Sequence, residues 1–307
     1  MKTKTGINDV LWMLAGVAVL LVCLLMVFHF HKNQDPAAQV AFKARRVELV
    51  DRMQLDLASA SEAEKSAVLA ITDEDSLTFA DQARAASAKV EQGRRELGEL
   101  LPVSGSPTGE PELLAQFSTA FAEFQRIDKE LLALAVKNTN LKAYSLAFGP
   151  AATVLKAMDA ALARLTTEDA QVLRFADHAR IAAWRLLTLI PPHIAEEDEN
   201  KEDALEALMA IEDAKVHQCL DGLAALPKIS SNPELTTART RYADFTQIKT
   251  RIIALSRENS NVRSLSISLN QKRKIMLVCQ DALSALRQAI LAEPIAGLTS
   301  GTPVRPR

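Results

Sequence analysis

Apolar residues recur every three or four positions along most of the chain, which is the spacing of a helix with one buried face. One such stripe consists of Leu114, Phe117, Phe121, Phe124, Ile127, Leu131 and Leu134. A second stripe, with identical steps, consists of Leu235, Ala238, Tyr242, Phe245, Ile248, Ile252 and Leu255. No stretch alternates between apolar and polar residues as a half-buried strand would. The pattern predicts an all-α fold in which long helices pack as bundles.

The two stripes belong to a longer internal repeat. Residues 121–165 and 242–286 align without a gap at a constant offset of 121. The first copy shares these residues with the second: Phe124, Ile127, Ala133, Leu134, Asn138, Asn140, Ser145, Ala161, Leu162 and Leu165. A fixed period of this length indicates two copies of one supersecondary unit.

Breaks in the apolar pattern divide each copy into predicted helices. In the first copy they fall at Asp73–Asp75, Pro102–Pro111 and Asn138–Asn140. In the second copy they fall at Ile190–Asn200, Pro227–Pro233 and Glu258–Asn261. Long helices joined by short loops pack as antiparallel neighbours, so each copy is expected to form an up-down four-helix bundle.

The predicted domains follow the repeat: a first bundle over residues 33–165, a second over 166–292, and a flexible tail over 293–307. At their junction, Thr166–Asp169 has the composition of a helix N-terminus. If a new helix begins there, the two bundles lie side by side. If one helix instead continues from Leu141 to Leu189, it spans about 75 Å and stacks the bundles end to end. We prefer the new helix.

The N-terminal region, residues 1–32, is predicted to be a short tail and a membrane anchor. Leu11–Phe30 carries no charged residue, and about 20 residues of helix match a hydrocarbon core of about 30 Å. A cleaved signal peptide is the alternative, but its apolar region is shorter and ends in a small-x-small site, which is missing here. We therefore expect a single uncleaved span over residues 11–30.

Composition narrows the range of functions. The net charge is −2, and no basic stripe interleaves with aromatic residues, so we expect no nucleic-acid partner. The sequence has no haem motif, no phosphate-binding glycine loop and no nucleophile elbow, so we expect neither an enzyme nor a cofactor. We expect His178, His193 and His217 to have no carboxylate partner on a shared helix face. Cys219 and Cys279 lie on apolar stripes and are expected to be buried and structural.

Polar residues kept in both copies are the candidate binding site. The set is Asn138, Asn140 and Lys142, with Asn259, Asn261 and Arg263 in the second copy. These side chains offer polar contacts to a small ligand or a partner. The preferred alternative is structural, because Asn caps helix N-termini and tolerates turn geometry.

Three charged clusters also stand out, and each is expected to be a solvated surface. Asp73–Asp75 and Glu196–Glu199 precede helices, where acidic residues complement the helix dipole. Their spacing does not match a calcium loop, so no metal site is predicted. Lys272–Lys274 interrupts an apolar stripe, and a partner patch or an anion site is the alternative there.

The N-terminal span, the helical unit and the turn Leu255–Leu265 together resemble the sensing region of methyl-accepting chemotaxis receptors. The resemblance covers about residues 10–292 and includes the doubled unit of bimodular helical sensors. It implies a four-helix sensor domain outside the cytoplasm, with Arg263 or Arg273 as possible contacts for an acidic ligand. The second membrane span and the cytoplasmic signalling hairpin of such receptors have no counterpart in this sequence, so we expect this chain to act through a partner.

The expected function is therefore a ligand-recognition or sensor module in signal transduction or chemotaxis. We expect it in a bacterial inner membrane, with the soluble part on the extracytoplasmic side, although Lys32, Lys43, Arg45 and Arg46 beyond the span oppose that orientation. Expected partners are the membrane, a small molecule, and a second copy or a receptor. The alternative is a membrane-anchored structural adaptor without a small-molecule ligand.

Overall fold

The computed structural model describes residues 36–101, 109–165 and 169–295. These residues form helices, turns and bends, and no strand occurs among them, which confirms the all-α class. The predicted anchor at residues 11–30 and most of the predicted tail lie outside the described residues.

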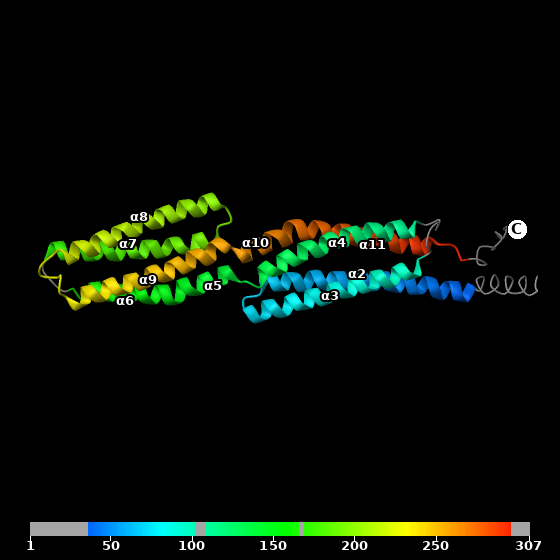
Figure 1. Ribbon diagram of the computed structural model, residues 1–307, viewed down its shortest axis with the longest axis horizontal. Helices are drawn as coiled ribbons and strands as arrows, with labels where there is room; N and C mark the ends of the chain where they lie inside the picture. Colours follow the sequence, from blue (N-terminus) through cyan, green and yellow to red (C-terminus); the bar gives the residue numbers. More distant parts are fainter. Residues whose placement is uncertain (1–35, 102–108, 166–168, 296–307) are drawn as a thin grey trace, which may run out of the picture. The chain divides into compact units, whose positions relative to one another are not determined.

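The helices follow one another in the order shown in Figure 1: α2 (Pro36–Leu69), α3 (Asp73–Leu100), α4 (Glu110–Ala135), α5 (Thr139–Leu146), η1 (Ala147–Ala151), α6 (Ala152–Ala163), α7 (Ala170–Ala195), α8 (Glu199–Ala224), α9 (Pro233–Glu258), α10 (Ser260–Ile267), η2 (Ser268–Lys272) and α11 (Arg273–Ala292). The elements η1 and η2 are single π-helical turns, and the repeat offset of 121 relates them residue by residue.

Several predicted helix starts are capped by side chains. The Asp169 carboxylate accepts from the backbone N–H of Gln171 at 3.0 Å, so a new helix begins after Leu165 as preferred. Asp198 caps α8 in the same way, accepting from Asn200 N–H at 2.9 Å, and Asn232 caps α9. Each cap satisfies a backbone donor that the helix leaves unpaired. How the two predicted bundles lie relative to one another stays a prediction.

Helix α7 is longer than the sequence suggests. It continues through Pro191 and Pro192 to Ala195, whereas the predicted break begins at Ile190. Each proline removes one backbone donor, so the helix loses two bonds of its hydrogen-bond ladder at this end. The Tyr144 hydroxyl also donates to the Pro191 carbonyl at 3.3 Å, which holds this end in place.

The helices form two compact units built from segments that are distant in sequence. The first unit falls within residues 1–58, 86–122 and 277–307, and the second within 59–85 and 123–276. The units therefore differ from the consecutive modules 33–165 and 166–292 that the repeat suggests. Because both copies carry the same apolar stripe, the pattern does not say which copy a given helix packs against.

In the second unit, α7 lies along α8 and α6 lies along α9 (Figure 1). The helix that follows the first Asn turn thus packs against the helix that precedes the second one. Their shared core includes Leu155, Met158, Leu186, Leu223 and Phe245, each at most 1% exposed. Burial of large apolar side chains, at about 1.5–3 kcal/mol each, holds these helices together.

The first unit joins its earliest and latest segments through buried charge. Arg46 and Glu110 are 2% and 0% exposed, and they pair at 2.6 Å. Arg46 also pairs with Glu293, and the Lys43 ammonium donates to the carbonyls of Leu291 and Glu293 at 2.6 and 2.7 Å. Lys43 therefore caps the C-terminal end of α11, and Arg46 binds the carboxylate that follows it.

Two described stretches, Glu110–Ala163 and Pro233–Ala292, each contain an 18-residue window that is apolar enough to cross a membrane, with a mean hydropathy of 1.3. Both contribute apolar residues to the packed cores described above. Core helices pass the same test, so this observation is weak evidence for a membrane location.

Candidate functional site at the repeated turns

The two Asn turns have the same unusual backbone. Asn138 has φ 51° and ψ 39°, and its repeat counterpart Asn259 has φ 50° and ψ 38°. These are the positive-φ residues other than glycine in the described part of the chain. Left-handed geometry is strained for most side chains and tolerated by Asn. A single left-handed residue at each turn therefore explains why the sequence keeps Asn in both copies.

The helices that follow the turns cap each other. The backbone N–H of Thr139 donates to Ser260 Oγ at 3.1 Å, and the N–H of Ser260 donates to Thr139 Oγ1 at 3.0 Å. The N–H of Asn140 donates to Asn261 Oδ1 at 3.2 Å, and the reverse bond measures 3.1 Å. Backbone donors in the first turns of α5 and α10 are thus satisfied by side chains of the other copy.

The side-chain amides extend this reciprocal arrangement. Asn140 Nδ2 donates to Asn259 Oδ1 at 2.7 Å, and Asn261 Nδ2 donates to Asn138 Oδ1 at 3.0 Å. Each bond has its counterpart when the two copies are exchanged, so the turns are related by a local two-fold. At the rim, Lys137 pairs at 2.5 Å with Glu258, its own repeat counterpart.

The remaining amide protons bond to the ends of neighbouring helices. Asn138 Nδ2 donates to Asp73 Oδ1 at 3.0 Å, and Asn259 Nδ2 donates to the Glu196 carbonyl at 2.6 Å. The Asn138 amide, with Lys142 3.0 Å away, lowers the pKa of the Asp73 carboxyl. The two acidic turns thus anchor the Asn turns.

The structure therefore brings the predicted Asn residues together but engages their amides within the protein. Asn138, Asn140 and Asn259 are at most 6% exposed. Neither Asn138 nor Asn259 caps its own helix with its side chain, so the expected capping operates between copies instead. Lys142 and Arg263 lie at the surface. A ligand contact by these six residues stays a prediction.

Two expectations for charged residues were wrong. Lys272 is not on a solvated face: it is 1% exposed, while Arg273 and Lys274 are exposed. Its partner Asp128 is 144 residues away in sequence, so the local pattern could not reveal it. His217 does have a carboxylate on its own helix, since its Nε2 lies 3.9 Å from Asp213 Oδ2 at spacing i,i+4.

Both cysteines predicted to be structural are buried, Cys219 at 7% and Cys279 at 0% exposure. Burial raises the pKa of the Cys219 thiol. A raised pKa leaves little reactive thiolate near neutral pH, which fits a packing role.

A buried polar cluster around His193 was missed by the sequence reading. His193 is fully buried, and its ring nitrogens lie 2.7 Å from Ser256 Oγ and 2.9 Å from Glu206 Oε1. Burial alone would raise the pKa of Glu206, but hydrogen bonds from Arg257 and His193 outweigh it and lower that pKa. Because an ionised carboxylate only accepts, His193 Nε2 carries a proton. These residues come from α7, α8 and α9, so only the packing assembles them.

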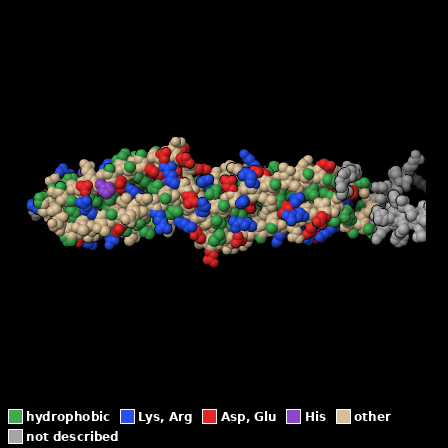
Figure 2. Space-filling view, in the orientation of Figure 1, with side chains coloured by type: hydrophobic (Ala, Val, Ile, Leu, Met, Phe, Trp, Pro, Cys, Tyr) green, Lys and Arg blue, Asp and Glu red, His purple; other side chains and the backbone are tan. Residues whose placement is uncertain are grey.

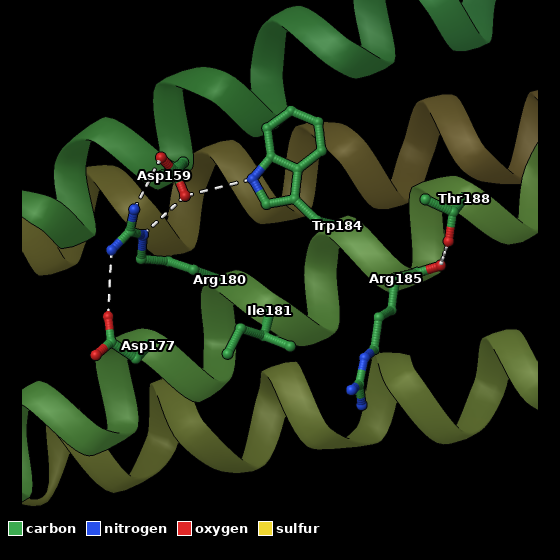
Figure 3. Close-up of a pocket in the computed structure, with 7 residues that line it drawn as sticks. All are labelled: Asp159, Asp177, Arg180, Ile181, Trp184, Arg185 and Thr188. Carbon is green, nitrogen blue, oxygen red and sulfur yellow. Dashed lines mark hydrogen bonds and ion pairs between the residues drawn. The ribbon is translucent and has the colours of Figure 1, made fainter.

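Among the described residues, a surface groove is lined by both aromatic and cationic side chains, as shown in Figure 3. It has a volume of about 580 Å³ and is lined by Asp159, Asp177, Arg180, Ile181, Trp184, Arg185 and Thr188. Asp159 accepts from Arg180 Nε at 2.7 Å and from the Trp184 indole at 3.3 Å. The Arg180 hydrogen bond, offset in part by burial, lowers the pKa of Asp159.

Arg185 differs from Arg180 in this groove. Its guanidinium points away from Asp159 and Asp177 in Figure 3. Ile181, which is 50% exposed, lies between Arg180 and Arg185 on α7. Elsewhere, Figure 2 shows acidic and basic side chains interspersed over the visible face. Several opposite charges pair one helical turn apart, such as Glu123 with Arg126. The groove can therefore accommodate an apolar group beside a cation.

Among the described residues, no cluster of His, Cys, Asp and Glu is suited to hold a metal ion.

No protein-family model and no curated protein matches this sequence. Among solved structures, the chain is similar to the sensor domain of the histidine kinase sensor TorS from V. parahaemolyticus. The TM-score is 0.51 at 11% sequence identity, and the match covers 81% of this chain and 96% of that one. At this identity the similarity establishes a shared all-helical fold.

Proposed function

We propose that this protein is a membrane-anchored sensor module built from two tandem up-down bundles, which recognises a ligand and signals through a partner protein. The partner is a receptor or kinase of the chemotaxis or histidine kinase type, or a second copy of this chain. Residues 11–30 anchor the chain in a bacterial inner membrane, and the helical part lies on the extracytoplasmic side. Similarity in fold to a kinase sensor domain supports the sensory role, and the predicted span supports the anchor.

The observation that carries the proposal is the reciprocal capping of α5 and α10. Each helix start depends on Thr139, Asn140, Ser260 or Asn261 of the other copy. A displacement of one turn therefore removes hydrogen bonds from the other, and buried unpaired donors cost about 1–3 kcal/mol each. A sensor requires coupling of this kind, here between the starts of α5 and α10, to transmit a binding event from one part of the protein to another.

The groove beside Trp184 supports a small anionic ligand with an apolar part, such as an organic acid. Trp184 and Ile181 offer apolar surface, and Arg185 offers a guanidinium that binds carboxylates in a bidentate manner. Most ligand sites combine an apolar lining with a few oriented polar groups.

The proposal is tested by thermal-shift screening of the full chain in nanodiscs against amino acids and organic acids. We expect at least one acid to raise the unfolding temperature, and Arg185→Ala to weaken its binding about tenfold or more, since charged hydrogen bonds contribute about 1.5–3 kcal/mol. Arg174→Ala, an exposed arginine on the same helix, is the control and should bind as the natural protein does. Absence of a shift across the library, with no receptor co-purifying, would count against a sensor.

A second candidate, a structural adaptor, is favoured by the exposed apolar residues of the two π-helical turns. Phe148 is 68% exposed and its repeat counterpart Leu269 is 58% exposed. Exposed apolar side chains kept at equivalent positions suit protein contacts. Cross-linking in membranes separates the candidates: an adaptor keeps the same partners whether or not the acids are present, whereas a sensor changes them.

A further inference from the structure

The π-helical turn η2 holds a buried group of charged residues. Lys272 is 1% exposed, its ammonium pairs with Asp128 of α4, and it lies 3.2 Å from the centroid of the Phe124 ring. Glu64 of α2 is fully buried, and neither of its carboxyl oxygens has a hydrogen-bond partner. Ser268, the first residue of η2, lies beside this carboxyl and lowers its pKa.

The repeat shows that these charges are not needed to build the turn. Lys272 corresponds to Ala151 in η1, which is fully buried, and Asp128 corresponds to Lys249, which pairs with Asp213 at 3.0 Å. The same π-helical turn thus forms around a methyl group in one copy and a buried ammonium in the other. A buried ion pair is often no more stabilising than apolar residues of similar volume, so its presence in η2 points to a role beyond packing.

The charge balance of the group depends on Glu64. Lys272 and Asp128 neutralise each other, so ionising Glu64 places an uncompensated negative charge in the core. Burial raises the pKa of the Glu64 carboxyl above its ordinary value of 4.5, and Asp128 adds to that increase. Ser268, Lys272 of η2 and Lys65 of its own helix lower the pKa without cancelling the effect of burial.

We infer that Glu64, Asp128 and Lys272 form a pH-sensitive switch that controls whether the η2 turn is closed. With Glu64 protonated the group is neutral and the turn stays closed around Lys272. When Glu64 loses its proton to water, two carboxylates face one ammonium away from solvent, and the turn opens to hydrate them. This inference concerns regulation of the last helix and does not depend on the proposed ligand or partner.

A π-helical turn is suited to such a change because it contains one residue more than an α-helical turn. Its opening changes how the backbone continues from η2 into the start of α11. The turn η1 contains Pro150, whereas η2 contains no proline and keeps all its backbone donors. The two turns therefore provide a comparison within one molecule.

The direction of the pH effect follows from linkage. In the open turn Glu64 is hydrated and its pKa is near the ordinary value of 4.5, while in the closed turn the pKa is higher. The closed turn is therefore fully favoured below pH 4.5 and loses its advantage as the pH rises through the closed-state value. Between the two values the opening equilibrium increases about tenfold for each pH unit.

Hydrogen–deuterium exchange of the full chain in nanodiscs tests the switch, with rates corrected for the intrinsic pH dependence of exchange. Protection of the 268–272 amides should fall about tenfold or more between pH 5 and pH 8. Protection of the 147–151 amides in η1 should stay constant. Glu64→Gln, which is neutral at every pH, should remove the decline, and the control Glu62→Gln, an exposed carboxyl on the same helix, should keep it.

Constant protection of η2 over this range in the natural protein would overturn the inference. So would a decline that persists in Glu64→Gln, or an equal decline in η1. If Glu64→Gln fails to fold, the comparison of η2 with η1 in the natural protein decides the question by itself.

Discussion

At the scale of single residues, asparagine carries out two tasks at each repeated turn. Asn138 and Asn259 supply left-handed backbone, and Asn140 and Asn261 supply side-chain oxygens to the helix start of the other copy. Asn suits both, because its short amide tolerates positive φ and both donates and accepts. Repetition in the sequence thus reflects mutual dependence of the two turns.

Removing one of these amides should weaken the fold. Asn140→Ala loses bonds to Ile194 O and Asn259 Oδ1 and leaves the Asn261 N–H without its acceptor. We expect a loss of about 2–4 kcal/mol in the free energy of unfolding, because buried partners remain unpaired. Urea unfolding measures the change. Asn270→Ala, on the surface of η2, is the matched control and should cost less than about 0.5 kcal/mol; equal losses would contradict the account.

At the scale of elements, the chain is shaped by caps, by two π-helical turns and by close approaches between helices. The caps at Asp169, Asp198 and Asn232 are visible in the sequence, because capping is local. The turn η2 is not visible in the sequence, since it has no Gly or Pro to mark it, whereas η1 contains Gly149 and Pro150. The hydrophobic pattern likewise does not show where neighbouring helices approach each other closely.

Substitution of glycine by alanine should have opposite effects on stability at two positions in different helical elements. A methyl group at Gly149 in η1 meets no atom within 4 Å beyond its own helix, but Gly149 precedes Pro150, whose Cδ crowds the Cβ of a helical residue before it. Gly149→Ala should therefore stabilise the protein by less than the gain of about 0.5–1 kcal/mol that helix propensity alone gives. At Gly222 in α8 it would lie 2.8 Å from the Phe175 ring, so Gly222→Ala should destabilise by about 1–3 kcal/mol through overpacking. Thermal and urea unfolding of the two variants compare them, and equal signs would contradict the packing described.

At the scale of the whole molecule, stability depends on ionised carboxylates held by cations. The Arg94 hydrogen bond, offset in part by burial, lowers the pKa of Glu91 to about 2, and Arg95 adds to the effect. The pKa values of Asp159 and Asp213 are lowered as well. Glu64 has the opposite shift, so acid weakens most of the molecule while it favours the closed η2 turn.

Acid unfolding should reveal the depressed carboxylates. A group whose folded pKa is lowered stabilises the fold above its unfolded value and loses that effect as the pH falls through the folded value. For Glu91 the window runs from about 4.5 down to about 2. We expect the free energy of unfolding to drop over this range and Glu91→Gln to make the drop shallower. Urea titrations between pH 2 and pH 6 measure it, and an unchanged slope in the variant would contradict the assignment.

The sequence alone determined the internal repeat and the features that depend on neighbours within one or two helical turns. The 3–4 spacing established the all-α class, the offset of 121 established the duplication, and Cys219 and Cys279 were correctly placed on buried stripes. Where a helix begins, how it is capped and which of its faces is buried depend on nearby residues, so a single sequence reveals them.

Only the tertiary structure decided which segments meet. Two copies with the same apolar stripe are interchangeable as packing partners, so the pattern could not place α6 against α9. It also could not bury Lys272, whose partner Asp128 is 144 residues away, or assemble His193 with Ser256 and Glu206 from three helices. These contacts are specific because desolvated polar groups must find partners, and that requirement acts across space rather than along the chain.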